Sequence, residues 1–194
     1  MRVEIRVVDR SSTLGFTRFL NRDYAIVDLY YKVLENPVYI DAILNHELMH
    51  VLACKIFNKK DCNSYGEIKG FNEILPIAKT LLLKLPEKQD PILYNLYSGL
   101  DVFVGSCEYR KICNQEEITL HVYSILYILL YRYNHKDVSA DYQTVLRVLR
   151  QNGFPVPLRG LIYSPDLQIT TGNINLMRYI DIIYKPYGQY NRYG

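Results

Sequence analysis

The most specific chemical pattern in the chain is a pair of histidines four positions apart, with a glutamate directly after the first. His46, Glu47 and His50 form the motif H-E-x-x-H inside an apolar stretch. On a helix of about 3.6 residues per turn, residues four apart lie on one face. Two imidazoles so placed can share a Zn²⁺ ion, and Glu47 can take a proton from a metal-bound water. The pattern predicts His46 and His50 as zinc ligands and Glu47 as the general base.

An alternative without metal uses the same residues. The two histidines could be buried and hydrogen-bonded side chains of a helix that packs in the core. Two neutral imidazoles beside a carboxylate are costly to bury unless something compensates them, so the metal site is favoured.

A helix from Val38 to about Phe57 is expected to position the motif. Asn36 and Pro37 form a start signal, because Asn accepts from unpaired amides and Pro suits the first helical turn. Apolar residues then recur at steps of three and four, without interruption by Gly or Pro. The polar segment 58–61 ends the pattern.

A catalytic zinc site usually has three protein ligands, so the motif needs one more residue. H-E-x-x-H followed by a Glu on the next helix resembles the gluzincins, a group of zinc peptidases. The resemblance implies Glu73, which together with Asn72 opens an apolar run containing Pro76 in its first turn. Gluzincins commonly carry an Asp four positions later, where this chain has Ile77. Support for a histidine is therefore expected from elsewhere, such as Asp101.

Other ligands stay open at this stage. The SprT-like DNA-repair proteases, which share H-E-x-x-H, use a third histidine, for which His121 and His135 are the matches here. Two further carboxylates, Glu67 and Glu108, are alternative candidates for the third zinc ligand. A developing oxyanion also needs a donor, and the candidates are His121, Tyr65 and Tyr109.

Periodicity and turn residues predict the remaining elements. Strands are expected at 3–8 and 24–33, with Val3, Ile5 and Val7 on one face of the first. Helices are expected near 72–85, 90–111, 115–133, 140–151 and 173–184. The expected fold class is α+β: a mainly helical, zincin-like domain over residues 1–183 with a small N-terminal β-sheet, followed by a Tyr-rich tail at 184–194.

Composition limits the classes of partner. The chain has 194 residues and a net charge of +3, too little to indicate nucleic acid by itself. No apolar run is long enough to span a membrane, and charges near Met1 argue against a signal peptide, so a cytoplasmic protein is expected. The four cysteines form no C-x-x-C pair. They are expected to be reduced, or to include a Cys54–Cys62 bridge if the source is a hyperthermophile.

These patterns predict a zinc-dependent metallopeptidase that acts on a protein or peptide substrate and does not associate with a membrane. Similar layouts occur in the ImmA/IrrE-like peptidases, which cleave repressors. The alternative is a non-enzymatic, zincin-fold binding protein for nucleic acid or a protein partner. In that case the tail, with Lys185 and Arg192 among tyrosines, would stack on single-stranded nucleic acid. A peripheral tail is the favoured interpretation.

Overall fold

The computed structural model describes residues 1–9, 12–84, 89–155, 161–162 and 164–184. The elements in chain order are β1 (Arg2–Val8), β2 (Gly15–Asn21), β3 (Tyr24–Tyr30), η1 (Tyr31–Glu35), α1 (Pro37–Ile56), α2 (Phe71–Leu83), α3 (Pro91–Tyr109), α4 (Gln115–Tyr131), η2 (Lys136–Val138), α5 (Ser139–Gln151), β4 (Gln168–Thr171) and α6 (Ile174–Tyr184). The α+β, mainly helical class predicted from the sequence is confirmed. The segment 185–194 of the predicted tail lies outside the described residues.

The sheet is small and mixed, with strand order β2-β3-β1-β4. β1 runs parallel to β3 and β4, and β2 pairs antiparallel with β3 at one edge. Val3 and Ile5 are buried on one face of β1, as predicted. The sequence did not predict β2, because its residues are half-buried or exposed and Phe16 is 53% exposed. β4 was also missed, since it has only four residues.

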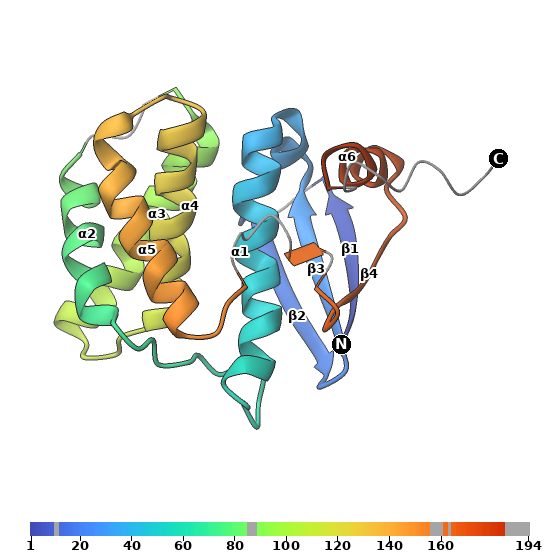
Figure 1. Ribbon diagram of the computed structural model, residues 1–194, viewed down its shortest axis with the longest axis horizontal. Helices are drawn as coiled ribbons and strands as arrows, with labels where there is room; N and C mark the ends of the chain where they lie inside the picture. The colour runs from blue at the N-terminus through green and yellow to red at the C-terminus, as the bar shows by residue number, and fades with distance from the viewer. Residues whose placement is uncertain (10–11, 85–88, 156–160, 163, 185–194) are drawn as a thin grey trace.

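Helix α1 lies between the sheet and a layer formed by α2, α3, α4 and α5, while α6 lies at the sheet end of the molecule (Figure 1). Every residue of α1 from Tyr39 to Cys54 except His50 is buried. A helix that is covered on opposite sides needs apolar residues around its whole circumference. α1 has apolar residues both toward the sheet and toward the helical layer. The predicted start is correct, because the Asn36 side chain accepts from the Val38 amide and Pro37 opens the helix.

Helix α4 is the inner helix of the helical layer. It packs against α1, α2, α3 and α5, and its side chains from Leu120 to Leu130 are buried with the exception of His121. The polar side chains that α4 and α1 present to each other therefore meet inside the molecule, where each needs a partner.

Two disulfides close short loops. Cys54–Cys62 ties the end of α1 to the following turn, which decides between the two states expected for this pair. Cys107–Cys113 spans the connection from α3 to α4 and was not predicted. Within the described part of the chain, no helix combines the length and apolar character needed to cross a membrane.

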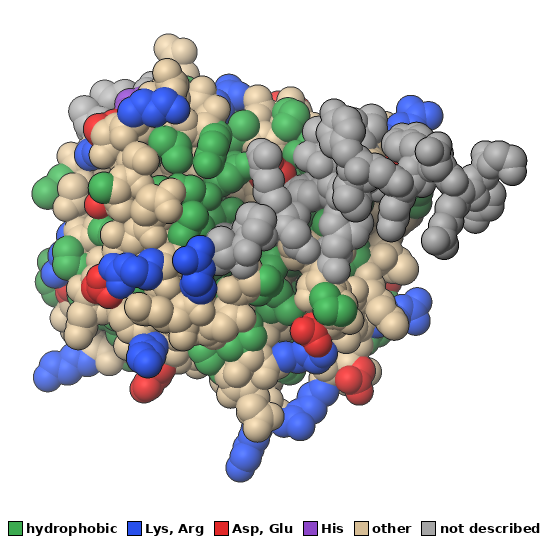
Figure 2. Space-filling view, in the orientation of Figure 1, with side chains coloured by type: hydrophobic (Ala, Val, Ile, Leu, Met, Phe, Trp, Pro, Cys, Tyr) green, Lys and Arg blue, Asp and Glu red, His purple; other side chains and the backbone are tan. Residues whose placement is uncertain are grey.

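Positive charge is dispersed over the face drawn in Figure 2, where Lys and Arg side chains are scattered and several lie beside acidic ones. Among the described residues, exposed ion pairs include Lys55 with Asp166 at 2.9 Å and Lys84 with Asp137 at 3.2 Å. Exposed pairs of this kind add little stability, but they reduce the positive field available to a polyanion.

Candidate metal centre

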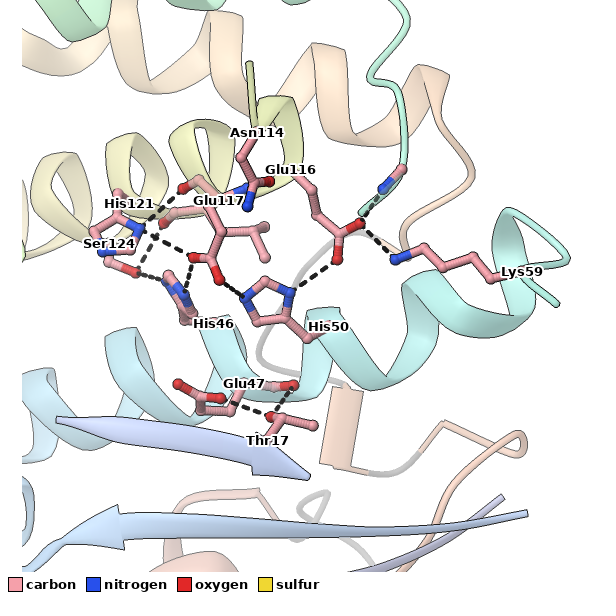
Figure 3. Close-up of polar contacts among 12 residues, drawn as sticks. Thr17, His46, Glu47, His50, Lys59, Asn114, Glu116, Glu117, His121 and Ser124 are labelled. Atoms are coloured by element: carbon pink, nitrogen blue, oxygen red, sulfur yellow. Dashed lines mark hydrogen bonds and ion pairs between the residues drawn. The ribbon is translucent and has the colours of Figure 1, made fainter. Parts of the chain in front are cut away.

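The two motif histidines project from α1 toward α4, where both meet the carboxylate of Glu117 (Figure 3). His46 Nε2 lies 3.5 Å from Glu117 Oε2, and His50 Nε2 lies 3.3 Å from Glu117 Oε1. All three side chains are largely buried. The four-residue spacing thus places both imidazoles on one helical face, and a single carboxylate lies against them.

A third imidazole joins the cluster from α4. His121 Nδ1 lies 2.9 Å from the backbone carbonyl of Glu117 and 3.4 Å from its Oε2. His46, Glu117 and His121 each offer a ligand atom within 4.8 Å of the others. With His50 against the second oxygen of Glu117, three imidazoles and one carboxylate converge. Nitrogen and carboxylate oxygen are ligands that Zn²⁺ prefers in proteins, so the residues fit this ion.

The outer nitrogens of the motif histidines are already occupied. His46 Nδ1 lies 3.2 Å from Ser124 Oγ, and His50 Nδ1 lies 2.8 Å from Glu116 Oε1. Since each Nδ1 has an outer partner, each Nε2 is directed at Glu117. Metal-binding histidines typically have such outer hydrogen bonds, which fix the ring and its tautomer. Asp101, expected to give this support, is exposed and does not line the cavity; Glu116 and Ser124 take its place.

Glu116 is fixed by three neighbours besides its own helix. It is 1% exposed, and in addition to His50 it accepts from Lys59 Nζ at 2.7 Å and from the Gly66 amide at 2.8 Å. Lys59 lies in the turn that the Cys54–Cys62 disulfide closes. A buried carboxylate with a cation and an amide as partners keeps its charge, so it can hold His50 in one orientation.

The electrostatics of the cluster follow from two adjacent carboxylates, Glu116, which is buried, and Glu117, which is partly buried. Burial raises the pKa of Glu117, but the charge on His50 and hydrogen bonds from His121 and His46 outweigh it and hold the pKa well below its usual range. Burial lowers the pKa of His50, yet Glu117 and Glu116 raise it to about 10. The pKa of His46 is lowered, mainly by burial. The two carboxylates therefore hold a positive charge on His50, and a metal ion bound at Nε2 would take the place of the His50 proton.

Glu47 points the other way, toward the sheet (Figure 3). Its Oε2 accepts a hydrogen bond of 2.6 Å from Thr17 Oγ1 on β2. The residue is 6% exposed, and Gly15 passes directly over it. This agrees with a rotation of about 100° per residue, which separates Glu47 from the histidine face.

The histidine cluster and Glu47 nevertheless open into one cavity of about 640 Å³. Its floor is formed by α1 and α4, and its walls by the start of β2 and by α3. Apolar side chains line the walls: Phe16, Phe19, Leu96, Val102 and Phe103. A cleft of this size with apolar walls and a few converging polar groups is typical of a ligand site.

The structure does not bring Glu73, the third ligand expected from the sequence, to the two motif histidines. Glu73 lies on the exposed side of α2 and forms an ion pair with Arg147 on α5, with one N–O distance of 3.0 Å. It does not line the cavity. The buried face of α2 carries Ile74 and Ile77 instead, so the helix presents apolar residues rather than Glu73 to the core.

The other sequence candidates divide clearly. Glu108 pairs with Lys79 at 2.6 Å, and neither Glu108 nor Glu67 lines the cavity. His121 belongs to the cluster. Of the two tyrosines, Tyr65 lines the cavity, whereas Tyr109 is 86% exposed and does not.

Sequence reasoning missed Glu117 and Glu116. Their signal is two adjacent carboxylates at the start of an otherwise apolar helix, with His121 four positions after Glu117. The pair Glu117 and His121 repeats on α4 the four-residue spacing that His46 and His50 have on α1. Such matched spacing on two helices places four potential ligands at one helix contact.

Comparisons of the chain with protein-family models, with curated proteins and with solved structures found no match. A function has to be inferred from the cavity itself.

Proposed function

We propose that the protein is a zinc-dependent metallopeptidase in which His46, His50 and Glu117 hold the metal. The observation that carries the proposal is the orientation of the two motif histidines. Each has its Nδ1 engaged by an outer partner and its Nε2 directed at Glu117. The resemblance to gluzincins is kept, with Glu117 of a later helix in the place expected for Glu73.

The roles of the residues follow from their positions. Zn²⁺ held by His46, His50 and Glu117 would supply a water of lowered pKa and would polarise a carbonyl group. Glu47 takes the proton of the attacking water and passes it to the leaving nitrogen, which is general acid–base chemistry. His121 lies at the edge of the cluster with its Nδ1 on the Glu117 backbone carbonyl, so only the doubly protonated ring can donate from Nε2 to the developing oxyanion.

A peptide substrate is favoured by the wall that covers Glu47. β2 is an edge strand, and its residues Gly15, Phe16 and Thr17 line the cavity. An extended peptide can pair with such an edge and place its backbone along the cleft. The dispersed positive charge in Figure 2 gives less support to a nucleic-acid ligand.

We propose a cytoplasmic location, which requires an organism whose cytosol allows disulfides to persist. Cys54–Cys62 and Cys107–Cys113 are both bridged, whereas the cytosol of most organisms keeps thiols reduced. The cytosol of hyperthermophiles is an exception. Thiol titration of protein purified from its native cells, with alkylation at lysis, tests this condition.

One observation favours a second candidate, a non-enzymatic binding protein with a structural metal. His121 offers a further nitrogen within the cluster, so four protein ligands could close the coordination sphere. Structural zinc sites are closed in this way, while catalytic sites keep one position open. The visible spectrum of the cobalt-loaded protein distinguishes the two, because an open site changes its spectrum when azide is added and a closed one does not.

The deciding experiment uses the full chain loaded with zinc and a mixture of fluorogenic peptides. Glu47→Gln should keep one zinc per chain, since Glu47 is not a ligand. Its hydrolysis should fall by about 10²–10⁴, the usual loss when a general base is removed. Glu73→Gln is the matched control, because this exposed glutamate lies outside the cavity, and it should cleave like the wild type. Unchanged turnover in Glu47→Gln, or no bound zinc in the wild type, would overturn the proposal.

A further inference from the structure

Glu47 is a buried carboxylate that is held from the sheet rather than from its own helix. Thr17 Oγ1 lies 2.6 Å from Glu47 Oε2 and 3.3 Å from the Glu47 backbone carbonyl. A hydroxyl has one proton to donate, and the shorter contact is to the charged group. The hydrogen bond therefore goes to the carboxylate. Because Thr is β-branched and lies in a strand, its side chain is restricted and its hydroxyl has a fixed direction.

Gly15 gives the second constraint on Glu47. A Cβ built on Gly15 would lie 2.5 Å from Glu47 Oε1, 2.7 Å from Cγ and 2.8 Å from Cδ. Gly15 is the first residue of β2, and its φ is not positive, so its backbone conformation is open to other residues. A side chain at this position would therefore displace Glu47, whereas the backbone itself would accept it.

We propose that Thr17 and Gly15 are positioning residues for Glu47: the hydroxyl fixes one carboxylate oxygen, and the absent side chain leaves room for the other. In this proposal β2 has a second role besides lining the substrate cavity. It fixes the position of the Glu47 carboxylate relative to the histidine cluster between α1 and α4. This inference rests on the proposed function for the role of Glu47, but the position of the carboxylate can be tested without any activity.

On the opposite wall of the cavity, formed by α3, a glycine likewise lies against a side chain of the site. A Cβ on Gly99 of α3 would lie 2.5 Å from His121 Nε2. Gly105, two turns further on α3, has nothing within 4 Å of such a Cβ. The chain thus offers a neutral control for glycine replacement, since Gly105→Ala adds a methyl group to open space.

The test compares Thr17→Val, Thr17→Ser and Gly15→Ala with Gly105→Ala. The first readout is the crystal structure of each variant without substrate. In Thr17→Val and Gly15→Ala the Glu47 carboxylate should leave β2, and in Thr17→Ser and Gly105→Ala it should stay. All four should bind zinc as the wild type does, because no ligand changes. Gly15→Ala should fold, since the group it displaces is the flexible end of a side chain.

The second readout is kinetic and uses one peptide chosen from those the wild type cleaves. Thr17→Val and Gly15→Ala should lower kcat by about 10- to 100-fold, comparable to the loss of one hydrogen bond to a charged group. KM should change less than about twofold, and Thr17→Ser should recover most of the activity. A general loss of structure would change KM and zinc content as well.

The outcomes separate the two proposals. If Glu47 keeps its place in the Thr17→Val and Gly15→Ala crystals, the positioning role is wrong whatever the enzyme does. Equal kcat in Thr17→Ser and Thr17→Val would also overturn it, since the hydroxyl would then be irrelevant. If Glu47→Gln cleaves like the wild type, the proposed function fails, and the crystal structures still decide whether β2 holds the carboxylate.

Discussion

Two carboxylates that are largely removed from solvent lie beside α1, Glu117 near its middle and Asp90 at its start, and they have different kinds of partner. Glu117 lies against imidazole nitrogens. Asp90 is 5% exposed and accepts from the Tyr39 and Tyr133 hydroxyls and from the amides of Ile92 and Leu93, with the Tyr133 contact at 2.5 Å. Burial raises the pKa of Asp90, but the hydrogen bonds from Tyr133, Tyr39 and the amides lower it below its usual value.

The partners of the two carboxylates differ in whether they always carry the proton that they donate. Tyrosine hydroxyls and amides carry their protons at neutral pH, so they satisfy Asp90 permanently. An imidazole nitrogen, in contrast, has a lone pair when it is unprotonated, and through that lone pair it can bind a metal. A buried carboxylate alone therefore does not indicate a metal site. A carboxylate among imidazoles, with the motif histidines each oriented by an outer partner, has the donor atoms that the proposed metal site requires.

The largest effect is expected when the carboxylate at the cluster is removed. Glu117→Ala should lower zinc affinity by more than about 100-fold, because losing a direct ligand costs more than losing an outer partner. Glu73→Ala is the matched control and should bind zinc normally, since Glu73 pairs with Arg147. Competition with a chromophoric chelator measures both. Release of zinc by Glu73→Ala alone would restore the ligand set expected from the sequence.

Replacing Asp90, the other carboxylate of the comparison, should lower the stability of the fold and leave the proposed metal site intact. Asp90→Asn should lower the free energy of unfolding by about 2–3 kcal/mol, because it weakens a helix cap and two tyrosine hydrogen bonds. Urea unfolding and zinc content measure the two effects. Since the folded-state pKa of Asp90 is lowered, its contribution is complete above the unfolded value of about 3.9 and is lost as pH falls through the folded value.

The pH series also gives the outcome that would break the comparison. The stability difference between wild type and Asp90→Asn should shrink toward acid pH. A constant difference from pH 7 to pH 3 would mean that the charge of Asp90 plays no part.

The smallest effect is expected at the outer partner of His50. Glu116→Gln should lower zinc affinity by about 10- to 100-fold, because it keeps the shape but removes the charge that His50 and Lys59 face. Glu108→Gln is the control, as Glu108 is an exposed partner of Lys79. An affinity equal to that of the wild type would show that Glu116 stabilises the fold without acting on the metal site.

Local signals were enough to predict α1 and its motif. Asn36 and Pro37 act at adjacent positions, and the histidine face depends only on the helical repeat, so no distant contact is needed. The same kind of signal cannot choose the third ligand. Glu73 and Glu117 both lie in the first turn of an apolar helix, where acidic residues are common because they complement the helix dipole. Which one meets His46 and His50 depends on which helix packs against α1.

The sheet side of the site shows the same limit. β2 is an edge strand whose residues are half-buried or exposed, so it lacks the regular burial that makes β1 readable. Thr17 and Gly15 take their roles from the approach of β2 to Glu47, which lies 30 positions from Thr17 in the sequence. Contacts of this range are set by tertiary packing and leave no local pattern.

The long sequence separation at the α1–α4 contact has a thermodynamic consequence. His50 and Glu116 are 66 positions apart, and His46 and Ser124 are 78 apart. An unfolded chain does not hold such groups together, so an ion that binds here binds the folded state. By linkage, a free ion at about 100 times its Kd adds about 2.7 kcal/mol to the free energy of unfolding. We therefore expect a bound ion to hold α4 against α1 as a reversible cross-link, and a chelator to lower the melting temperature without any change of sequence.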